Sequence, residues 1–217
     1  MLDFLDFALK YLPYVARGAI VTIELTVLAL TLGAVLGLLG ALAKQSGRQP
    51  FVFIANVYVE VIRGTPALLQ IFVMYFGLAT YGLRLDPLSA AALTLGIIGG
   101  AYITEIIRAG IEAVDRGQVE AATSLGMAPS AIMRRIVLPQ AVVLMVPPFT
   151  NFLIALIKDT SLALTISVPE IMYRSYDVAS QTFRSMEIYA VAGIIYLAMC
   201  YPLSRLARRL ERRRAPR

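Results

Sequence analysis

Five long stretches of this sequence contain no charged side chain, and they limit the possible folds more than any other feature. They cover residues 25–43, 64–83, 87–104, 136–157 and 188–204 and are 17 to 22 residues long. Roughly 20 apolar residues in a helix span about 30 Å of hydrocarbon. A transmembrane β-barrel would instead need alternating polarity over about 10 residues. The sequence therefore predicts an all-α membrane protein with five transmembrane helices.

The composition agrees with this class. Hydrophobic residues make up 59% of the chain, charged residues 16%, and the mean hydropathy is +0.73, whereas about a quarter of an average soluble protein is charged. We find no internal repeat or linker, so residues 1–217 are predicted to form one domain. With flanking turns added, the predicted spans cover about residues 18–43, 52–80, 87–108, 137–157 and 187–206.

Several prolines and glycines refine these helices. Residues 1–17 are expected to form an interfacial helix ending near Pro13. Pro66 is expected to kink the second span, and Pro147 with Pro148 to interrupt the fourth. The first span carries glycines spaced three or four residues apart. This pattern either lets another helix pack closely against the span or reflects the ordinary tolerance of membrane helices for glycine. These residues are Gly33, Gly37 and Gly40.

The distribution of basic residues predicts the orientation. With the carboxyl terminus inside, the inner segments hold 13 Lys and Arg and the outer segments hold 6, with Arg63 inside a span. The positive-inside rule therefore places the amino terminus outside. The net charge of +6 comes largely from an arginine-rich tail that includes Arg205, Arg208 and Arg209. Anionic lipid headgroups at the inner face explain this tail better than nucleic acid does.

Missing residue types exclude several kinds of chemistry. The chain has no His and one cysteine, Cys200, so we expect no metal site, haem ligand or internal disulfide. No Gly-Lys dipeptide occurs, which excludes a P-loop. We therefore expect no cofactor and no enzyme activity in this chain, with any ATP bound by a partner subunit. Asp3 and Asp6 stand where a secretory signal would be basic, so no cleaved signal is expected.

The inner loop at residues 115–139 predicts a helix-turn-helix. Residues 118–125 form a short helix that ends at Gly126, which can adopt the left-handed conformation. Pro129 suits the first turn of a second helix. Small alanines beside an acidic residue would let a partner's groove approach this helix, although a plain amphipathic connector has the same pattern. The residues concerned are Glu120, Ala121 and Ala122.

The spacing of this loop resembles a known signature. Glu120-Ala121-Ala122, three residues, Gly126, nine residues and then Ile136-x-Leu138-Pro139 is similar to the EAA loop of ATP-binding-cassette importer permeases. Other segments resemble the polar amino-acid permeases that import histidine, glutamine, arginine and relatives. These segments are Gly18 with Thr22 and Leu25, Glu60-x-x-Arg63-Gly64-Thr65-Pro66, Tyr102-x-Thr104-Glu105-x-x-Arg108-x-Gly110, and Lys158-Asp159-Thr160-Ser161-Leu162.

The resemblance carries expectations about partners and function. It implies a permease subunit in the plasma or inner membrane of a bacterium, forming the translocation path by alternating access. It also implies a second permease subunit (a homodimer or a close paralogue), a cytoplasmic ABC ATPase and an extracytoplasmic amino-acid-binding protein. In the family this loop is the coupling helix that docks on the ATPase, a role carried to Glu120, Ala121, Ala122 and Gly126.

Charged and polar residues inside the spans are candidates for the substrate path, because an isolated charge at that depth costs about 3 kcal/mol. Glu60 and Arg63 lie three residues apart and form either a structural ion pair or contacts with an amino-acid substrate. Thr65 follows them. A second cluster lies at the end of the fourth span. It either supplies a hydrogen-bond donor and an acceptor for an amino-acid substrate, or it consists of charges at the membrane interface. It comprises Asn151, Lys158, Asp159, Thr160 and Ser161.

Two other classes of protein remain possible at this stage. A secondary transporter or channel subunit would also place charges in spans, but five spans without a repeat or pore ring fit it poorly. A membrane-bound enzyme would be expected to carry His or a paired-carboxylate motif, and this sequence has neither. The sequence does not select one amino acid, although the acidic residues Asp159, Glu60 and Glu24 favour a cationic one. Glu105 and Arg108 are expected to support the inner end of the third span.

Overall fold

The computed structural model describes residues 2–212, with side chains described for residues 3–209, and this part of the chain is helical throughout with no strand. Arg213, Arg214 and Arg217 of the basic tail lie outside the described residues. The elements in chain order are α1 (Leu2–Gln45), α2 (Gln49–Gly64), α3 (Ala67–Phe72), the π-helix η1 (Val73–Gly77), α4 (Leu78–Thr80), α5 (Pro87–Glu112), α6 (Arg116–Ser124), α7 (Pro129–Ile132), the π-helix η2 (Met133–Val137), α8 (Leu138–Asp159), the 3₁₀-helix η3 (Thr160–Ile166), α9 (Ile171–Thr182) and α10 (Ser185–Arg212).

Four helices within the described residues are long and apolar enough to cross a membrane. They begin at Asp3, Pro87, Pro129 and Ser185. A fifth span exists if α2 and the segment Ala67–Thr80 are counted together, although the two are bent by 104°. The all-α membrane class is therefore confirmed, with four or five candidate spans.

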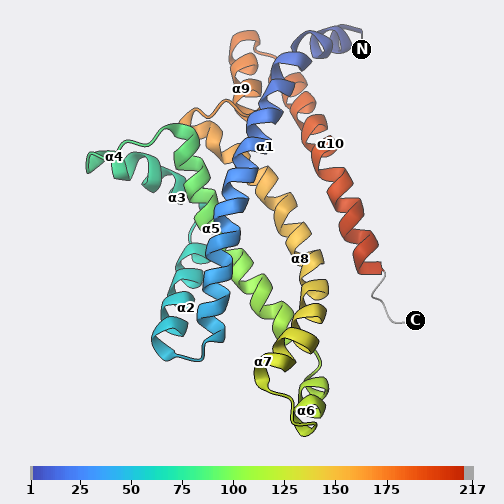
Figure 1. Ribbon diagram of the computed structural model, residues 1–217. Helices are drawn as coiled ribbons and strands as arrows, with labels where there is room; N and C mark the ends of the chain where they lie inside the picture. The colour runs from blue at the N-terminus through green and yellow to red at the C-terminus, as the bar shows by residue number, and fades with distance from the viewer. Residues whose placement is uncertain (1, 213–217) are drawn as a thin grey trace.

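The predicted kink at Pro66 is a full break of the helix. Thr65 is extended (φ −116°, ψ 146°) and ends α2, because a residue that precedes proline is pushed out of the helical region. After the break, α3, η1 and α4 run away from the axis of α2 (Figure 1). Residues 52–80, predicted as a second span with a kink at Pro66, thus fold as a bent pair of helices that together could form one span.

Three other prolines at which an interruption was predicted do not interrupt their helices. The interfacial helix predicted to end near Pro13 instead continues as α1 to Gln45, and α8 continues through Pro147 and Pro148. A proline removes one backbone hydrogen bond. Ending a helix in an apolar environment leaves several backbone groups unsatisfied, which costs more. At the start of α1, the buried side chains of Phe7 and Val15 also hold the helix against α9 and α10.

Glycines allow α1 and α5 to pack closely along much of their length. A Cβ atom built at Gly37 would lie 2.5 Å from the Ile103 side chain, and one built at Gly40 would overlap Oγ1 of Thr104. From the other side, a Cβ at Gly96 would meet the Leu32 side chain at 2.7 Å. The structure thus confirms that the small residues of the first span serve close helix packing.

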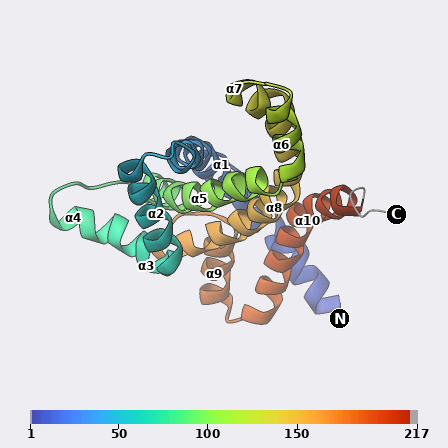
Figure 2. The same ribbon diagram turned by 90° about the horizontal axis from the view of Figure 1, so that it is seen from below.

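The short helix α9 is fixed to the beginning of α1 and α10 (Figures 1 and 2). The Tyr14 hydroxyl of α1 donates a 2.7 Å hydrogen bond to Asp177 of α9. Arg184, at the start of α10, forms ion pairs with Asp3 and Glu187. The α6–α7 loop lies at the opposite end of the molecule from α9 (Figure 1).

Candidate translocation path and coupling loop

The loop that follows α5 folds as the predicted helix-turn-helix. Helix α6 ends in a Schellman motif, in which Met127 N–H donates to the Ala122 carbonyl and Gly126 N–H to the Thr123 carbonyl. Gly126 has φ +75°, so its left-handed conformation is confirmed. Pro129 occupies the first turn of α7, also as predicted. The local sequence therefore determines this turn.

The two alanines of the loop have different environments, contrary to the expectation that both face a partner. Ala122 is buried against Val114, Ile132 and Val137, whereas Ala121 is exposed. Successive residues on a helix point about 100° apart, so Ala121 can face outward while Ala122 faces the core. Glu120, Ala121 and the 83%-exposed Leu125 form the outward surface of α6.

The loop is attached to the helices on both sides of it. Gln140 of α8 donates a 2.6 Å hydrogen bond to the Gln118 side chain of α6. A hollow of about 480 Å³ lies where α6 meets η2 and α8, and Ala121, Leu125 and Arg135 contribute to its wall. A displacement of α6 would therefore be transmitted directly to α8.

A chain of charged side chains joins the ends of α1 and α5 near this loop. Lys44 of α1 pairs with Glu105 of α5, and Arg108 pairs with Glu105 at 2.9 Å and also with Glu112. Glu105 is only 20% exposed. The expectation that Glu105 and Arg108 support this end of the third span is confirmed, with Lys44 as an additional partner that sequence spacing did not indicate.

A groove between α5 and α8 brings together some of the predicted substrate-path residues. It has a volume of about 340 Å³, and Tyr102, Asn151, Phe152 and Asp159 are among the residues that line it. Tyr102 and Phe152 stack at 5.8 Å between ring centroids. The guanidinium carbon of Arg63 lies 5.0 Å from the Tyr102 ring centroid. Arg63 therefore contacts one ring of a groove whose wall also includes an amide and a carboxylate.

Glu60 and Arg63 do not form the ion pair that their spacing allowed. No salt bridge between them exists in the described structure; Arg63 contacts the face of Tyr102 instead. A guanidinium over an aromatic ring gains about 0.5–1 kcal/mol at an exposed site. Glu60 is exposed on α2. Tyr102 was not predicted as a path residue, because a contact between α2 and α5 has no signal in sequence spacing.

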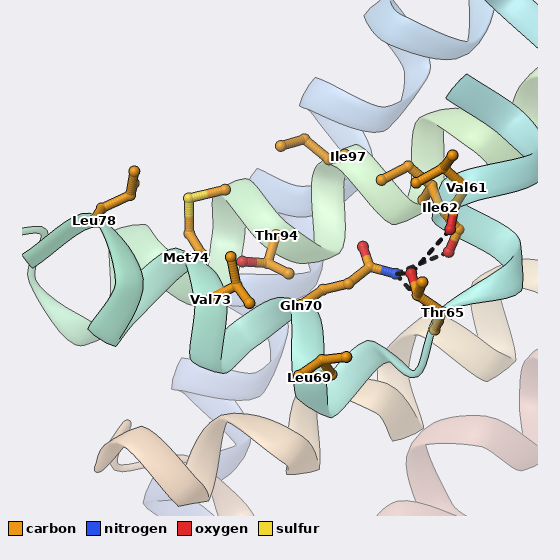
Figure 3. Close-up of a pocket in the computed structure, with 10 residues that line it drawn as sticks. All are labelled: Val61, Ile62, Thr65, Leu69, Gln70, Val73, Met74, Leu78, Thr94 and Ile97. Atoms are coloured by element: carbon orange, nitrogen blue, oxygen red, sulfur yellow. Dashed lines mark hydrogen bonds between the residues drawn. The ribbon is translucent and has the colours of Figure 1, made fainter. Parts of the chain in front are cut away.

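The other predicted path residues lie outside this groove. Thr65 instead lines an apolar cavity of about 330 Å³ between α2, α3 and α5, where Gln70 reaches back to its hydroxyl and to the Ile62 carbonyl at 2.8 Å (Figure 3). Thr160 is fully buried and donates to the Ile157 carbonyl, so it does not face the groove. Lys158 is exposed and Ser161 is half-buried.

A buried carboxylate that sequence reasoning missed joins three helices. Glu170 caps the start of α9 by accepting hydrogen bonds from the Met172 and Tyr173 amides, and the Tyr196 hydroxyl of α10 donates to it at 2.9 Å. A Cβ at Gly18 of α1 would lie 2.7 Å from the Glu170 backbone. Burial raises the pKa of Glu170 to about 6, although these donors favour its charged form.

Nothing in the described residues is arranged as a metal site, since no group of three or more His, Cys, Asp or Glu side chains could hold an ion there. The fold and site thus define a polytopic α-helical membrane protein with a helix-turn-helix at one end.

Comparison with known proteins identifies the family. Residues 29–216 match the family described as the binding-protein-dependent transport system inner membrane component. The chain is 36% identical over 212 residues to the arginine transport system permease protein ArtQ of Bacillus subtilis strain 168, covering 96% of this chain and 97% of that protein. It is 39% identical over 204 residues to the glutamine transport system permease protein GlnP of Escherichia coli K12, covering 93% of each.

A solved structure agrees with these relatives. The chain is similar to the crystal structure of an amino acid ABC transporter with histidines, with a TM-score of 0.92, 39% sequence identity and coverage of 98% of this chain and 99% of that chain. The chain belongs to the family of inner membrane components of binding-protein-dependent transport systems. It is therefore an integral membrane permease subunit, and the family is one of transport subunits rather than of enzymes.

Proposed function

We propose that this chain is the membrane subunit of an ABC importer for polar amino acids in the bacterial inner membrane. Five spans, with α2 and α3–α4 forming a broken second one, would place the amino terminus outside and the α6–α7 loop in the cytoplasm. Two permease subunits, identical or paralogous, would enclose the path. A partner ATPase would bind and hydrolyse ATP, and an extracytoplasmic protein would deliver the amino acid.

The arrangement of the α6–α7 loop is the observation that carries this proposal. The loop connects α5 to α8, and these two helices form the walls of the groove. Glu120, Ala121 and Leu125 are outward-facing, so they are the surface on which the ATPase would dock. Ala122 and Gly126 act differently, because they set the packing and the turn that present this surface.

The groove between α5 and α8 has the chemistry that a zwitterionic substrate needs. Arg63 would meet the substrate carboxylate, while Asp159 would accept hydrogen bonds from the ammonium and Asn151 would supply either a donor or an acceptor. Tyr102 would form one wall. The names of the relatives include arginine and glutamine systems, which supports polar amino acids as the substrate class.

Alternating access follows from this geometry as a cycle. ATP binding would draw the two ATPases together and pull the α6 helices of the two permeases toward each other. Because α6 is attached to α5 and α8, this movement would open the groove toward the binding protein. Hydrolysis would release the ATPases, and the groove would then face the cytoplasm.

Replacing Gly126 tests the coupling role. Gly126→Val should reduce ATP-driven uptake in proteoliposomes at least tenfold while the ATPase retains basal hydrolysis, because valine disfavours φ +75° and disrupts the end of α6. Gly47→Val is a matched control. Gly47 also has a positive φ, of +64°, with open space around it, but it lies between α1 and α2. Equal uptake by the two variants would refute the assignment.

A separate substitution tests the groove. Asp159→Asn should raise the substrate concentration for half-maximal uptake and weaken substrate stimulation of the ATPase, with the complex still assembled. Glu24→Gln removes an exposed acid of α1 that is not among the residues lining the groove and serves as the control. If Asp159→Asn leaves uptake unchanged, Asp159 does not contact the substrate.

Purification from native membranes tests the assembly. In mild detergent, the tagged chain should co-purify with an ATPase in a complex of two permeases and two ATPases. The presence of a second permease sequence in that complex would distinguish a heterodimer from a homodimer. A chain that elutes alone and binds no ATPase would contradict the importer assignment.

A further inference from the structure

One face of α10 changes from apolar to cationic along its length. Ile194, Leu197, Tyr201, Arg205 and Arg208 follow one another at spacings of three or four residues, so they lie in one stripe. The first three are 62%, 63% and 48% exposed, and the two arginines are also exposed. This stripe, which we call the α10 stripe, thus runs from aliphatic through aromatic to cationic side chains.

The opposite face of α10 packs inside the protein. Ile188, Val191 and Ala192 are buried against α1 and α9, and Cys200 and Ala207 are buried further along. The α10 stripe therefore faces away from the packed side of this helix. In a membrane protein, that direction leads to lipid or to another subunit.

The cationic end of the stripe encloses a hollow of about 320 Å³. Among the residues whose side chains are described, Tyr201, Arg205, Arg208 and Arg209 line it, which places three guanidinium groups on its wall. Arg205 donates a 3.3 Å hydrogen bond to the Tyr201 hydroxyl, and its guanidinium carbon lies 5.7 Å from the Tyr201 ring centroid. Tyrosine is typical of the level at which lipid headgroups begin.

We propose that this hollow binds the phosphate of an anionic phospholipid, whose acyl chain lies along the α10 stripe. The planar fork of arginine suits the paired oxygens of a phosphodiester. The order of the side chains matches the lipid itself, with Ile194 and Leu197 beside the chain, Tyr201 at the glycerol level and the arginines at the headgroup.

The position of the hollow favours a lipid over the ATPase. The end of α10 lies apart from the α6–α7 loop in Figure 1, and that loop is where the ATPase would dock. An aliphatic surface leading into the cationic hollow also has no use in a contact with a soluble subunit. A phosphate site for a free anion would likewise not need the aliphatic part of the stripe.

Native mass spectrometry of the detergent-purified full chain tests this proposal. Phosphatidylglycerol should be retained in preference to phosphatidylcholine of the same acyl chains. Replacing the three arginines with glutamine (Arg205→Gln, Arg208→Gln and Arg209→Gln together) should weaken phosphatidylglycerol binding about tenfold or more, since each basic side chain near an anionic surface contributes to the affinity. Phosphatidylcholine retention should not change.

A matched control removes the same charge elsewhere. Arg48→Gln, Arg134→Gln and Arg135→Gln together replace three exposed arginines that lie near the α6–α7 loop or the α1–α2 turn. This variant should keep the preference for phosphatidylglycerol. An equal loss in both triple variants would show that total charge, and not the hollow, attracts the lipid, which would overturn the proposal.

Two further outcomes would identify another ligand. Full displacement of phosphatidylglycerol by millimolar inorganic phosphate would make the hollow a site for small anions. If the variant in Arg205, Arg208 and Arg209 lost its ATPase partner while retaining phosphatidylglycerol, the arginines would form a protein interface. Either result would overturn the lipid assignment. A thermal unfolding curve like that of the wild type would show that a loss of lipid is not a loss of fold.

Discussion

Replacing Gly37 with alanine probes the packing of α1 on α5 most directly. The new Cβ would lie 2.5 Å from both Cβ and Cγ2 of Ile103, whereas unbonded carbons favour about 3.5–4.0 Å. The Cβ of Ile103 is fixed by the helix backbone and its χ1 angle is restricted, so side-chain rotation gives little relief. The two helices must therefore move apart by about 1 Å. We expect Gly37→Ala to destabilise the protein by about 1–3 kcal/mol.

Thermal unfolding of the purified chain in mild detergent measures this effect against a matched control. Gly193 lies in α10 and is exposed, and no neighbouring atom lies within 4 Å of the position that a new methyl group would occupy. Because alanine is the better helix former, Gly193→Ala should leave the unfolding temperature unchanged or raise it. Gly37→Ala should lower it. If the two variants unfold at the same temperature, α1 and α5 are not in the close contact described here.

Three further measurements test polar contacts. Because the folded pKa of Glu170 is raised from 4.5 to about 6, its ionisation should cost about 2 kcal/mol of stability as pH rises from below 4.5 to above 6; Glu170→Gln should remove this dependence, and an unchanged pH profile would refute it. A double-mutant cycle of Lys44→Met with Glu105→Gln should give a coupling energy of about 1 kcal/mol, whereas additivity would exclude the pair. A second cycle, of Arg63→Gln with Tyr102→Leu, should give about 0.5–1 kcal/mol in unfolding measurements if the cation–π contact stabilises the fold.

Local signals predicted the turn of the α6–α7 loop correctly. Gly126 ends α6 in the left-handed conformation, and Pro129 begins α7. Both depend on backbone conformations that only a few residue types favour, so the sequence itself carries the information. The same holds for Pro66, which forces Thr65 out of the helix and ends α2.

Prolines inside the long apolar helices did not mark helix ends. Pro13, Pro147 and Pro148 are all accommodated without a break. At Pro147 and Pro148 the loss of one hydrogen bond is smaller than the cost of exposing helix ends to hydrocarbon, and at Pro13 the packing of Phe7 and Val15 holds the helix. Pro66 differs because Gly64 precedes it by two residues and is itself a poor helix former. A rule for soluble helices therefore overestimates helix breaking in membrane spans.

Contacts between distant segments could not be predicted from spacing. Arg63 was predicted either to pair with Glu60 three residues away or to contact the substrate, but it lies on the ring of Tyr102, 39 positions along the chain. Glu170 was not predicted as a buried residue, because in the sequence it resembles an ordinary helix cap before α9. Its burial depends on contacts with Tyr196 and Gly18, which come from distant segments. Such contacts depend on how α1, α5 and α10 pack together, and no short sequence pattern records that packing.

The position of α5 explains how one helix can serve both the groove and the loop. Its glycines fix it to α1, its Tyr102 lines the groove, and Glu112 marks its end before the loop. Tyr102 and Glu112 are ten residues apart, or about 15 Å along the helix. If the Glu112 end of α5 stayed in place, a tilt of the helix by about 10° would therefore move the ring of Tyr102 by about 3 Å. Because α8 lines the same groove and is hydrogen-bonded to α6 through Gln140, a movement of the loop must change the width of the groove unless α5 and α8 tilt together.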